Sequence, residues 1–212
     1  MEANIIYNID CLTGLRNLPD DSIDCCVTSP PYFNLRDYGV SGQIGLEDTP
    51  EQYIQKLVGV FHEVRRVLAP AGTLWVNIGD CYAGSGKGAA NYPDNAMKYK
   101  QGTNRGTVGQ SAIVKKFDGY KSKDLIGIPW MLAFALRADG WFLRQDIIWA
   151  KPNPMPESMK DRCTKSHEYI FLLTKSPKYY FDCEAIHEKA VTSGTIPTNA
   201  PRYGGNKYTA TP

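Results

Sequence analysis

Residues 23–32, IDCCVTSPPY, decide how the rest of the chain is interpreted. The nearly continuous run of apolar and weakly polar residues over 23–29 is typical of a strand whose two faces are both covered, as in α/β proteins. Two prolines then remove two backbone donors and fix φ, so the turn after the strand is stiff. A hydroxyl (Ser29) and an aromatic ring (Tyr32) flank the proline pair. The stretch therefore predicts a buried strand that ends in a rigid group of hydrogen-bond acceptors.

Outside this stretch, strand patterns alternate with helical patterns. A helix is predicted from Thr49, which suits the N-cap, with Pro50 in the first turn and Pro70 beyond its end. A second long helix is predicted over 128–140, and a short helical segment over 11–19. The other predicted strands cover 4–10, 73–80, 141–152, 168–175 and 178–182. This alternation predicts an α/β domain with a largely parallel sheet.

The composition is that of an ordinary globular protein. The 212 residues carry a formal net charge of only +2, so a nucleic-acid partner has to be argued from where the charges lie. The six cysteines form no C-x-x-C pair, so free thiols are expected and no metal site is predicted. No secretory signal and no run of membrane-spanning length is found, so the prediction is a cytoplasmic protein without a membrane partner.

Residues 81–125 differ from the rest of the chain. This segment holds seven glycines, interleaved tyrosines, and eight basic side chains against three acidic ones. A long loop within a compact domain is usually functional or disordered. A basic loop that follows a DNA backbone is one interpretation and a merely solvated loop is the other. The candidate backbone contacts are Lys87, Lys98, Arg105, Lys115 and Lys116. A nucleotide-triphosphate loop is disfavoured, because Cys81 and Gly88 stand where that motif needs a glycine and a hydroxyl.

Polar residues follow three of the predicted strands, at Asp10, at Ser29-Pro30-Pro31-Tyr32 (the SPPY turn) and at Asn77-x-Gly79-Asp80. In open α/β sheets, ligands bind beyond the carboxyl ends of strands. The Ser29 hydroxyl and the Pro30 carbonyl could accept the two N–H bonds of an exocyclic amine and draw its nitrogen toward tetrahedral geometry. Tyr32 would stack on the ring, which must first be flipped out of a duplex. The alternative is that these four residues form only a turn.

Three stretches carry a family resemblance: TSPPYFNLRDYG (28–39), LWVNIGDCYAGSGKG (74–88) and DIIWAKPNPMPESMKDRCTKSHEYIFLLTKSPKYYFD (146–182). Over residues 4–190 the chain resembles the amino-methylating DNA methyltransferases of restriction-modification systems and phages, most of all the cytosine-N4 branch. The resemblance implies methyl transfer from S-adenosyl-L-methionine to N4 of a flipped cytosine at a specific site in double-stranded DNA. It also implies a catalytic role for Ser29, Pro30, Pro31 and Tyr32. Serine at the first position is typical of N4-cytosine enzymes, and aspartate of N6-adenine enzymes.

The resemblance implies further site residues. Asp10 and Ser29 would contact the cofactor, and the base pocket would be lined by Asn77, Asp80, Lys151, His167 and Tyr169. Lys151 lies in the K-P-N-P stretch at the predicted pocket rim and could also meet a phosphate. Three structural alternatives stay open: Asp10 capping the next turn, Asp80 capping a helix or turn, and His167 filling a structural position.

One family element is missing from the sequence. The glycine-rich cofactor loop, D-P-F-x-G-S-G-T, does not occur, and about five of the family's seven core strands are expected. Residues 1–190 are interpreted as a partial catalytic domain with the insertion 81–125, and residues 191–212 as the start of a target-recognition segment or a disordered tail. A second chain or a missing C-terminal segment would complete the cofactor site and cover an exposed edge strand. The alternatives are an adenine-N6 enzyme, an RNA or protein methyltransferase, or a non-catalytic DNA-binding fragment.

Overall fold

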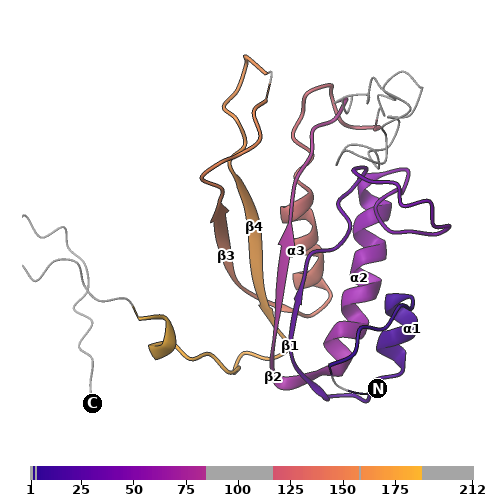
Figure 1. Ribbon diagram of the computed structural model, residues 1–212, viewed down its shortest axis with the longest axis vertical. Helices are drawn as coiled ribbons and strands as arrows, with labels where there is room; N and C mark the ends of the chain where they lie inside the picture. Colours follow the sequence, from indigo (N-terminus) through magenta and orange to yellow (C-terminus); the bar gives the residue numbers. More distant parts are fainter. Residues whose placement is uncertain (1, 3, 85–116, 158, 188–212) are drawn as a thin grey trace, which may run out of the picture. The chain divides into compact units, whose positions relative to one another are not determined.

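The computed structural model describes residues 2, 4–84, 117–157 and 159–187 (Figure 1). The chain divides into two units, residues 1–180 and 181–212. The first unit contains a four-stranded sheet with the order β1-β2-β4-β3. Its strands are β1 (Ile23–Thr28), β2 (Leu68–Ile78), β3 (Phe142–Ala150) and β4 (His167–Thr174). In the second unit, the described residues include one short 3-10 helix, η2 (Glu184–Ile186).

The sheet is mixed, which corrects the expectation of a largely parallel one. β1 pairs with β2 in parallel, whereas β4 pairs with both β2 and β3 in antiparallel fashion. No helix separates β3 from β4 in the described residues, and a parallel pair would need a crossover connection, so the chain returns as a hairpin. β3 and β2 run in the same direction, and β4 lies between them, antiparallel to both. The α/β class itself is confirmed.

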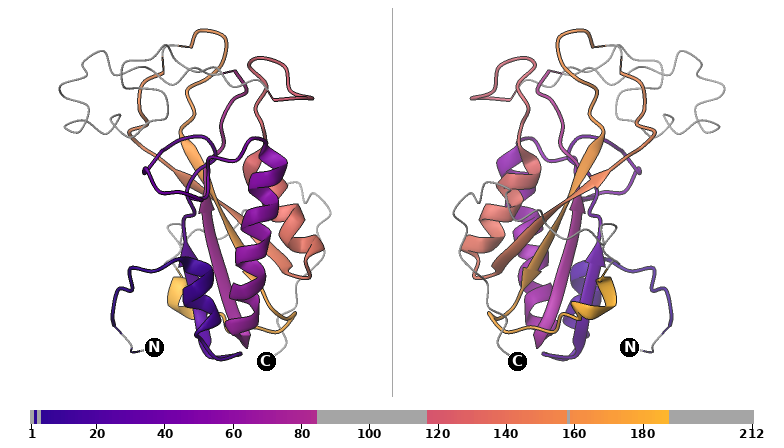
Figure 2. Two further views of the ribbon diagram at one scale, coloured as in Figure 1. Left: turned by 90° about the vertical axis from the view of Figure 1, so that its right-hand side faces the viewer. Right: turned by 90° about the vertical axis from the view of Figure 1, so that its left-hand side faces the viewer.

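Three helices accompany the sheet: α1 (Cys11–Arg16), α2 (Pro50–Val67) and α3 (Ile128–Ala138). α2 begins as predicted, because the Thr49 hydroxyl accepts a hydrogen bond from the Gln52 N–H at 3.2 Å. It ends at Val67, and Leu68 already takes extended dihedrals two residues before Pro70. α2 and α3 lie on one face of the sheet (Figure 2). The core between them is formed by buried side chains, among them Leu57, Phe61, Leu74, Val76, Ile78, Leu132, Leu136, Phe171 and Leu173.

The opposite face and the β1 edge of the sheet expose apolar side chains. Val27 on β1 is 78% exposed, and Trp149 on β3 is 51% exposed. Residues 4–10 were predicted to form a strand but do not, and Ile6 is 98% exposed. Residues 178–182 form no strand either. A strand needs a ladder of backbone hydrogen bonds with a neighbour. Among the described residues, segment 4–10 pairs with no strand, and segment 178–182 reaches β2 through the Tyr180 N–H, which donates to the Ala71 carbonyl at 3.1 Å without forming a ladder. Four strands are therefore described, not the expected five.

Several other expectations can be compared with the described residues. All six cysteines are free, as predicted. No helix in the described ranges is long and apolar enough to cross a membrane. Residues 85–116, which hold most of the basic insertion, and residues 188–212 lie outside the described residues, so the predicted domain boundary at residue 190 stays a prediction.

Candidate functional site

The SPPY turn directly follows β1, at the carboxyl ends of the parallel strands β1 and β2. Pro30 is buried, whereas Ser29 is exposed. The Pro31 carbonyl accepts a hydrogen bond of 2.7 Å from the hydroxyl of Tyr53, a fully buried side chain of α2. No described residue forms a hydrogen bond with the Pro30 carbonyl. The Pro31 carbonyl therefore links the turn to α2. The Pro30 carbonyl remains able to accept a hydrogen bond from a ligand.

The residues after the turn are held by close packing. Phe33 is buried, and its ring lies 5.3 Å from that of Tyr53 and 5.4 Å from that of Phe117. The Asn34 N–H donates to the Gly45 carbonyl at 2.6 Å. Gly45 has φ +103°, and a Cβ there would lie 3.0 Å from the Tyr32 carbonyl oxygen, so both the backbone conformation and the space favour glycine. The loop is thus folded tightly against the SPPY turn.

Tyr32 is the centre of a polar network that links residues on or just after all four strands of the described sheet. Its hydroxyl lies 2.9 Å from Glu168 Oε2 on β4 and 3.1 Å from Asn77 Oδ1 on β2. Glu168 in turn forms an ion pair with Lys151, which directly follows β3. The Asn77 amide donates to the Tyr169 carbonyl at 3.2 Å, which leaves its Oδ1 to face Tyr32. Three residues that the sequence assigned to the site, namely Tyr32, Asn77 and Lys151, are brought together in this way.

The environment of the network shifts two pKa values. Burial raises the pKa of Tyr32 to about 12; a hydrogen bond with Ser29 opposes this shift, and the Glu168 carboxylate adds to it. Burial also acts to raise the pKa of Glu168, but the hydrogen bonds from Lys151 and Tyr32 outweigh it, so the net pKa is lowered. At neutral pH, Tyr32 is therefore a neutral donor and Glu168 a charged acceptor.

Asp80 and Asp10 both serve as helix caps. Asp80 Oδ1 accepts from the N–H groups of Cys81 at 2.9 Å, Gly127 at 3.0 Å and Ile128 at 3.0 Å, and Gly127 also reaches Oδ2 at 3.1 Å. Asp10 Oδ1 accepts from both the N–H and the hydroxyl of Thr13 at the start of α1. The geometry therefore supports a capping role for both residues, which was the structural alternative to a role in the site.

His167 and Tyr169 face away from the polar network. The Tyr169 ring packs edge-on against Trp130 of α3 at 5.6 Å and is stacked on Phe171 at 5.8 Å. The His167 ring lies 5.2 Å from that of Tyr169. Because side chains alternate along a strand, the Glu168 between them points to the Tyr32 side. A contact of these two rings with a bound base stays a prediction.

A cavity of about 270 Å³ adjoins the SPPY turn. Its lining consists of Ser29, Pro30, Pro31, Tyr32, Leu35, Arg36 and Tyr38. It therefore brings a serine, two prolines and two tyrosines together with a leucine and an arginine.

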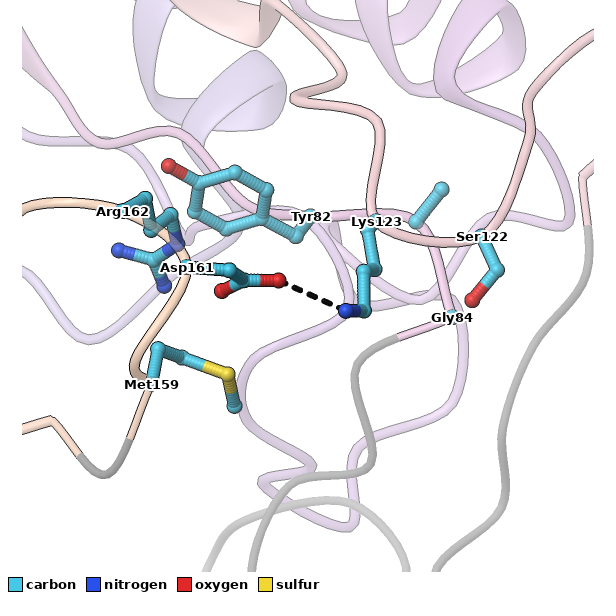
Figure 3. A pocket seen from close by; sticks show the side chains of 8 residues that line it. Tyr82, Gly84, Ser122, Lys123, Met159, Asp161 and Arg162 are labelled. Atoms are coloured by element: carbon cyan, nitrogen blue, oxygen red, sulfur yellow. Dashed lines mark hydrogen bonds and ion pairs between the residues drawn. The ribbon is translucent and has the colours of Figure 1, made fainter.

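A second cavity, of about 410 Å³, lies beyond the end of β2 and beside the β3–β4 connection (Figure 3). The Arg162 guanidinium lies 4.1 Å from the centre of the Tyr82 ring. Lys123 and Asp161, which also line this cavity, form an ion pair of 2.7 Å. The predicted backbone contacts Lys87, Lys98, Arg105, Lys115 and Lys116 lie outside the described residues. Across the ranges that the structure covers, no group of His, Cys, Asp or Glu side chains could hold a metal ion.

Sequence reasoning missed two residues that shape the site, Tyr53 and Glu168, and it placed Gly79 at the strand end without assigning it a role. A Cβ on Gly79 would lie 2.6 Å from Tyr32 Cε2, so only glycine lets the ring lie where it does. Glu168 was not among the predicted site residues, although it stands between two that were, His167 and Tyr169. The one signal for it was a carboxylate at the first position of a mostly apolar predicted strand, 168–175, where a buried carboxylate would need a partner.

Comparison with known proteins agrees with this geometry. A family model described as DNA methylase, of the N6/N4 type, matches residues 23–200. The chain is 50% identical over 193 residues to the type II methyltransferase M.Cfr9I of Citrobacter freundii, a match that covers 89% of this chain and 60% of that protein. It is 51% identical over 185 residues to M.SmaI of Serratia marcescens, covering 85% and 59% respectively.

Solved structures show the same fold. PvuII DNA methyltransferase, which is cytosine-N4-specific, matches with a TM-score of 0.54 at 17% identity, covering 83% of this chain and 50% of that one. A putative DNA modification methylase of Thermus thermophilus, solved with S-adenosyl-L-methionine, matches with a TM-score of 0.51 at 22% identity, covering 83% and 55%.

The described residues have the α/β fold of these two solved structures. The chain belongs to the N6/N4 DNA methylase family. It spans about three fifths of the length of the type II relatives that it matches, at 60% and 59% of M.Cfr9I and M.SmaI.

Proposed function

We propose that the protein transfers a methyl group from S-adenosyl-L-methionine to the exocyclic N4 of a flipped-out cytosine in double-stranded DNA, as part of a restriction-modification or phage system in the cytoplasm. The observation that carries the proposal is the SPPY turn, all four residues of which line one cavity. Serine at the first position and a cytosine-N4-specific relative of the same fold support cytosine over adenine.

The chemistry follows from the acceptors. The lone pair of an aryl amine is delocalised into its ring, so the amine is a poor nucleophile. Two acceptors on its N–H bonds draw the nitrogen toward tetrahedral geometry and free the lone pair for attack. The proline pair holds these acceptors in place before the base arrives, so the effect is one of positioning and preorganised dipoles and needs no strong base.

The methyl donor needs more protein than the described residues provide. When bound, it supplies an electrophilic methyl group. Asp10 is the side chain proposed to contact it, but Asp10 Oδ1 caps α1 and the preceding residues 4–9 form no strand. We infer that the described residues supply the base-binding half of the site and that the donor pocket needs residues beyond them.

We propose that a further segment, or a second chain, completes this half by packing on the exposed β1 edge. Val27 is 78% exposed there, and the type II relatives are longer than this chain. An unpaired strand edge with apolar neighbours is a surface that proteins normally cover.

The basic residues of the insertion, Lys87, Lys98, Arg105, Lys115 and Lys116, are proposed to contact the DNA backbone. Such contacts are sequence-independent and weaken steeply with salt. A second candidate function is DNA binding without catalysis, and the incomplete donor half is the observation that favours it.

A transfer assay distinguishes these functions. The chain is incubated with methyl-labelled S-adenosyl-L-methionine and unmethylated genomic DNA, alone and with the portion of M.Cfr9I that the chain does not match. We expect label in N4-methylcytosine for the complemented wild type and none for Ser29→Ala. Label found only in N6-methyladenine rejects the cytosine assignment. Salt-dependent DNA binding with no transfer under either condition favours the non-catalytic alternative.

A further inference from the structure

We propose that Glu168, held by Lys151, is a positioning residue that fixes the Tyr32 ring beside the amine-gripping Ser29 and Pro30. This role rests on the proposed function, because it concerns the geometry in which the target base is held. Nothing in the family resemblance or in the relatives assigns a role to Glu168.

The contacts show how the ring is fixed at its outer end. The Tyr32 hydroxyl lies 2.9 Å from Glu168 Oε2 and 3.1 Å from Asn77 Oδ1. The hydroxyl carries one proton, and a charged acceptor competes for it better than a neutral amide oxygen. Glu168 is therefore the principal partner, and the amide of Asn77 supports the same orientation.

The body of the ring is limited on its other side by Gly79. Because a Cβ at that position would fall 2.6 Å from Tyr32 Cε2, the ring lies directly against the backbone of residue 79. Tyrosine has two side-chain torsions, and a hydroxyl contact at one end together with a backbone contact along the ring leaves neither of them free. The ring thus has a single position before any base is bound.

Lys151 keeps the carboxylate of Glu168 charged and in place. The Glu168 side chain is 18% exposed and that of Lys151 is 40% exposed, so the pair is partly screened from water. An unpaired carboxylate at this depth would be costly, and the ion pair removes that penalty. Lys151 was predicted to contact substrate; its ion pair with Glu168 assigns it to the support of Tyr32.

A ring held in this way serves as a fixed stacking surface for the flipped base. If the hydroxyl contact is lost, the ring can rotate, and the base that stacks on it no longer presents its amine squarely to Ser29 and Pro30. Displacements of about 1 Å in such positioning groups reduce rates by up to roughly a hundredfold. The loss should appear in kcat, while the KM for the methyl donor stays unchanged, because the role proposed for Glu168 acts on the base through Tyr32.

A double-mutant cycle tests the inference in the complemented enzyme. Tyr32→Phe and Glu168→Gln are each expected to lower kcat about ten- to hundredfold, and the double variant is expected to be no slower than the slower single one. Gln preserves the shape of Glu, so a folding defect is not expected. Glu63→Gln is the matched control, because Glu63 pairs with Arg66 on α2 at 3.0 Å, and it should leave kcat unchanged. Reductions that multiply in the double variant would overturn the inference.

A second measurement does not depend on methyl transfer. In the 212-residue chain labelled with ¹³Cζ-tyrosine, the Tyr32 signal is assigned by its absence in Tyr32→Phe. Glu168→Gln should move that signal and Glu63→Gln should not. An unmoved Tyr32 signal rejects the positioning role even if the enzyme is active. A moved signal in a protein that transfers no methyl group supports the Tyr32–Glu168 contact and places the failure in the proposed function.

Discussion

Replacement of Asp80 separates a structural role from a substrate-binding one. In Asp80→Ala, the N–H groups of Cys81, Gly127 and Ile128, now bonded at 2.9 to 3.0 Å, lose their acceptor. Loss of an N-terminal cap costs about 0.5–2 kcal/mol, and loss of a negative charge at a helix N-terminus costs about 0.3–1 kcal/mol. Taken together, a decrease of about 2 kcal/mol in the free energy of unfolding is expected. Asp80→Asn keeps one acceptor oxygen and should lose about half as much.

Urea unfolding followed by circular dichroism measures this decrease. In a heat-unfolding experiment, a loss of about 2 kcal/mol corresponds to a fall of roughly 4–8 °C in Tm for a chain of this size. The ranking wild type, Asn, Ala is the specific expectation. An Asp80→Ala protein as stable as wild type, to within about 0.5 kcal/mol, would refute the capping argument. If that protein also bound DNA more weakly, Asp80 would be assigned to substrate binding instead of capping.

Three further changes probe the site and the sheet. Gly79→Ala places a methyl group 2.6 Å from Tyr32 Cε2, so the ring must move; urea unfolding should show a loss of about 1–3 kcal/mol, and an unchanged stability contradicts the close packing. Tyr53→Phe removes the 2.7 Å hydrogen bond to the Pro31 carbonyl and should cost about 1–3 kcal/mol by the same measurement, whereas a neutral result means that the turn does not depend on it. Burial, with a smaller contribution from a neighbouring thiol, raises the pKa of Cys26 to about 11. Iodoacetamide at about pH 8 should therefore modify Cys26 far more slowly than the exposed thiols. Equal modification rates, measured by mass spectrometry, would contradict its burial.

Periodicity and turn chemistry predicted the elements that carry their own signal. Thr49 and Pro50 indicated the start of α2, and the structure confirms it. The run over 23–29 indicated β1, and the SPPY turn follows it as expected. The predicted burial of this strand is wrong, because β1 lies at the edge of the described sheet and none of its residues is buried. These features are local, because caps, prolines and apolar spacing act within a few residues of where they stand.

Features that depend on distant partners could not be predicted in the same way. Residues 4–10 have the composition of a strand, yet no described strand pairs with them, and pairing is a property of the whole sheet. The carboxylate of Asp80 could bind a ligand as well as the N–H groups of Gly127 and Ile128. Because at least 46 residues lie between Asp80 and these partners, the sequence does not indicate which of the two it contacts. Residue numbers alone also could not show that Glu168 meets Tyr32 from across the sheet.

The parallel sheet expected from alternation failed for a related reason. Alternating strands and helices imply parallel neighbours only while each connection contains a helix. The connection between β3 and β4 contains none in its described residues, and the hairpin that it forms inserts β4 beside β2.

The most direct measurement of the central claim is the identity of the methylated base in cells. The complemented protein and its Ser29→Ala variant are expressed in a bacterial host that lacks DNA methyltransferases, and the DNA is hydrolysed to nucleosides for mass spectrometry. N4-methylcytosine is expected with the wild type and none above background with Ser29→Ala, at equal protein levels. N6-methyladenine alone, or N4-methylcytosine undiminished in the variant, would contradict the claim.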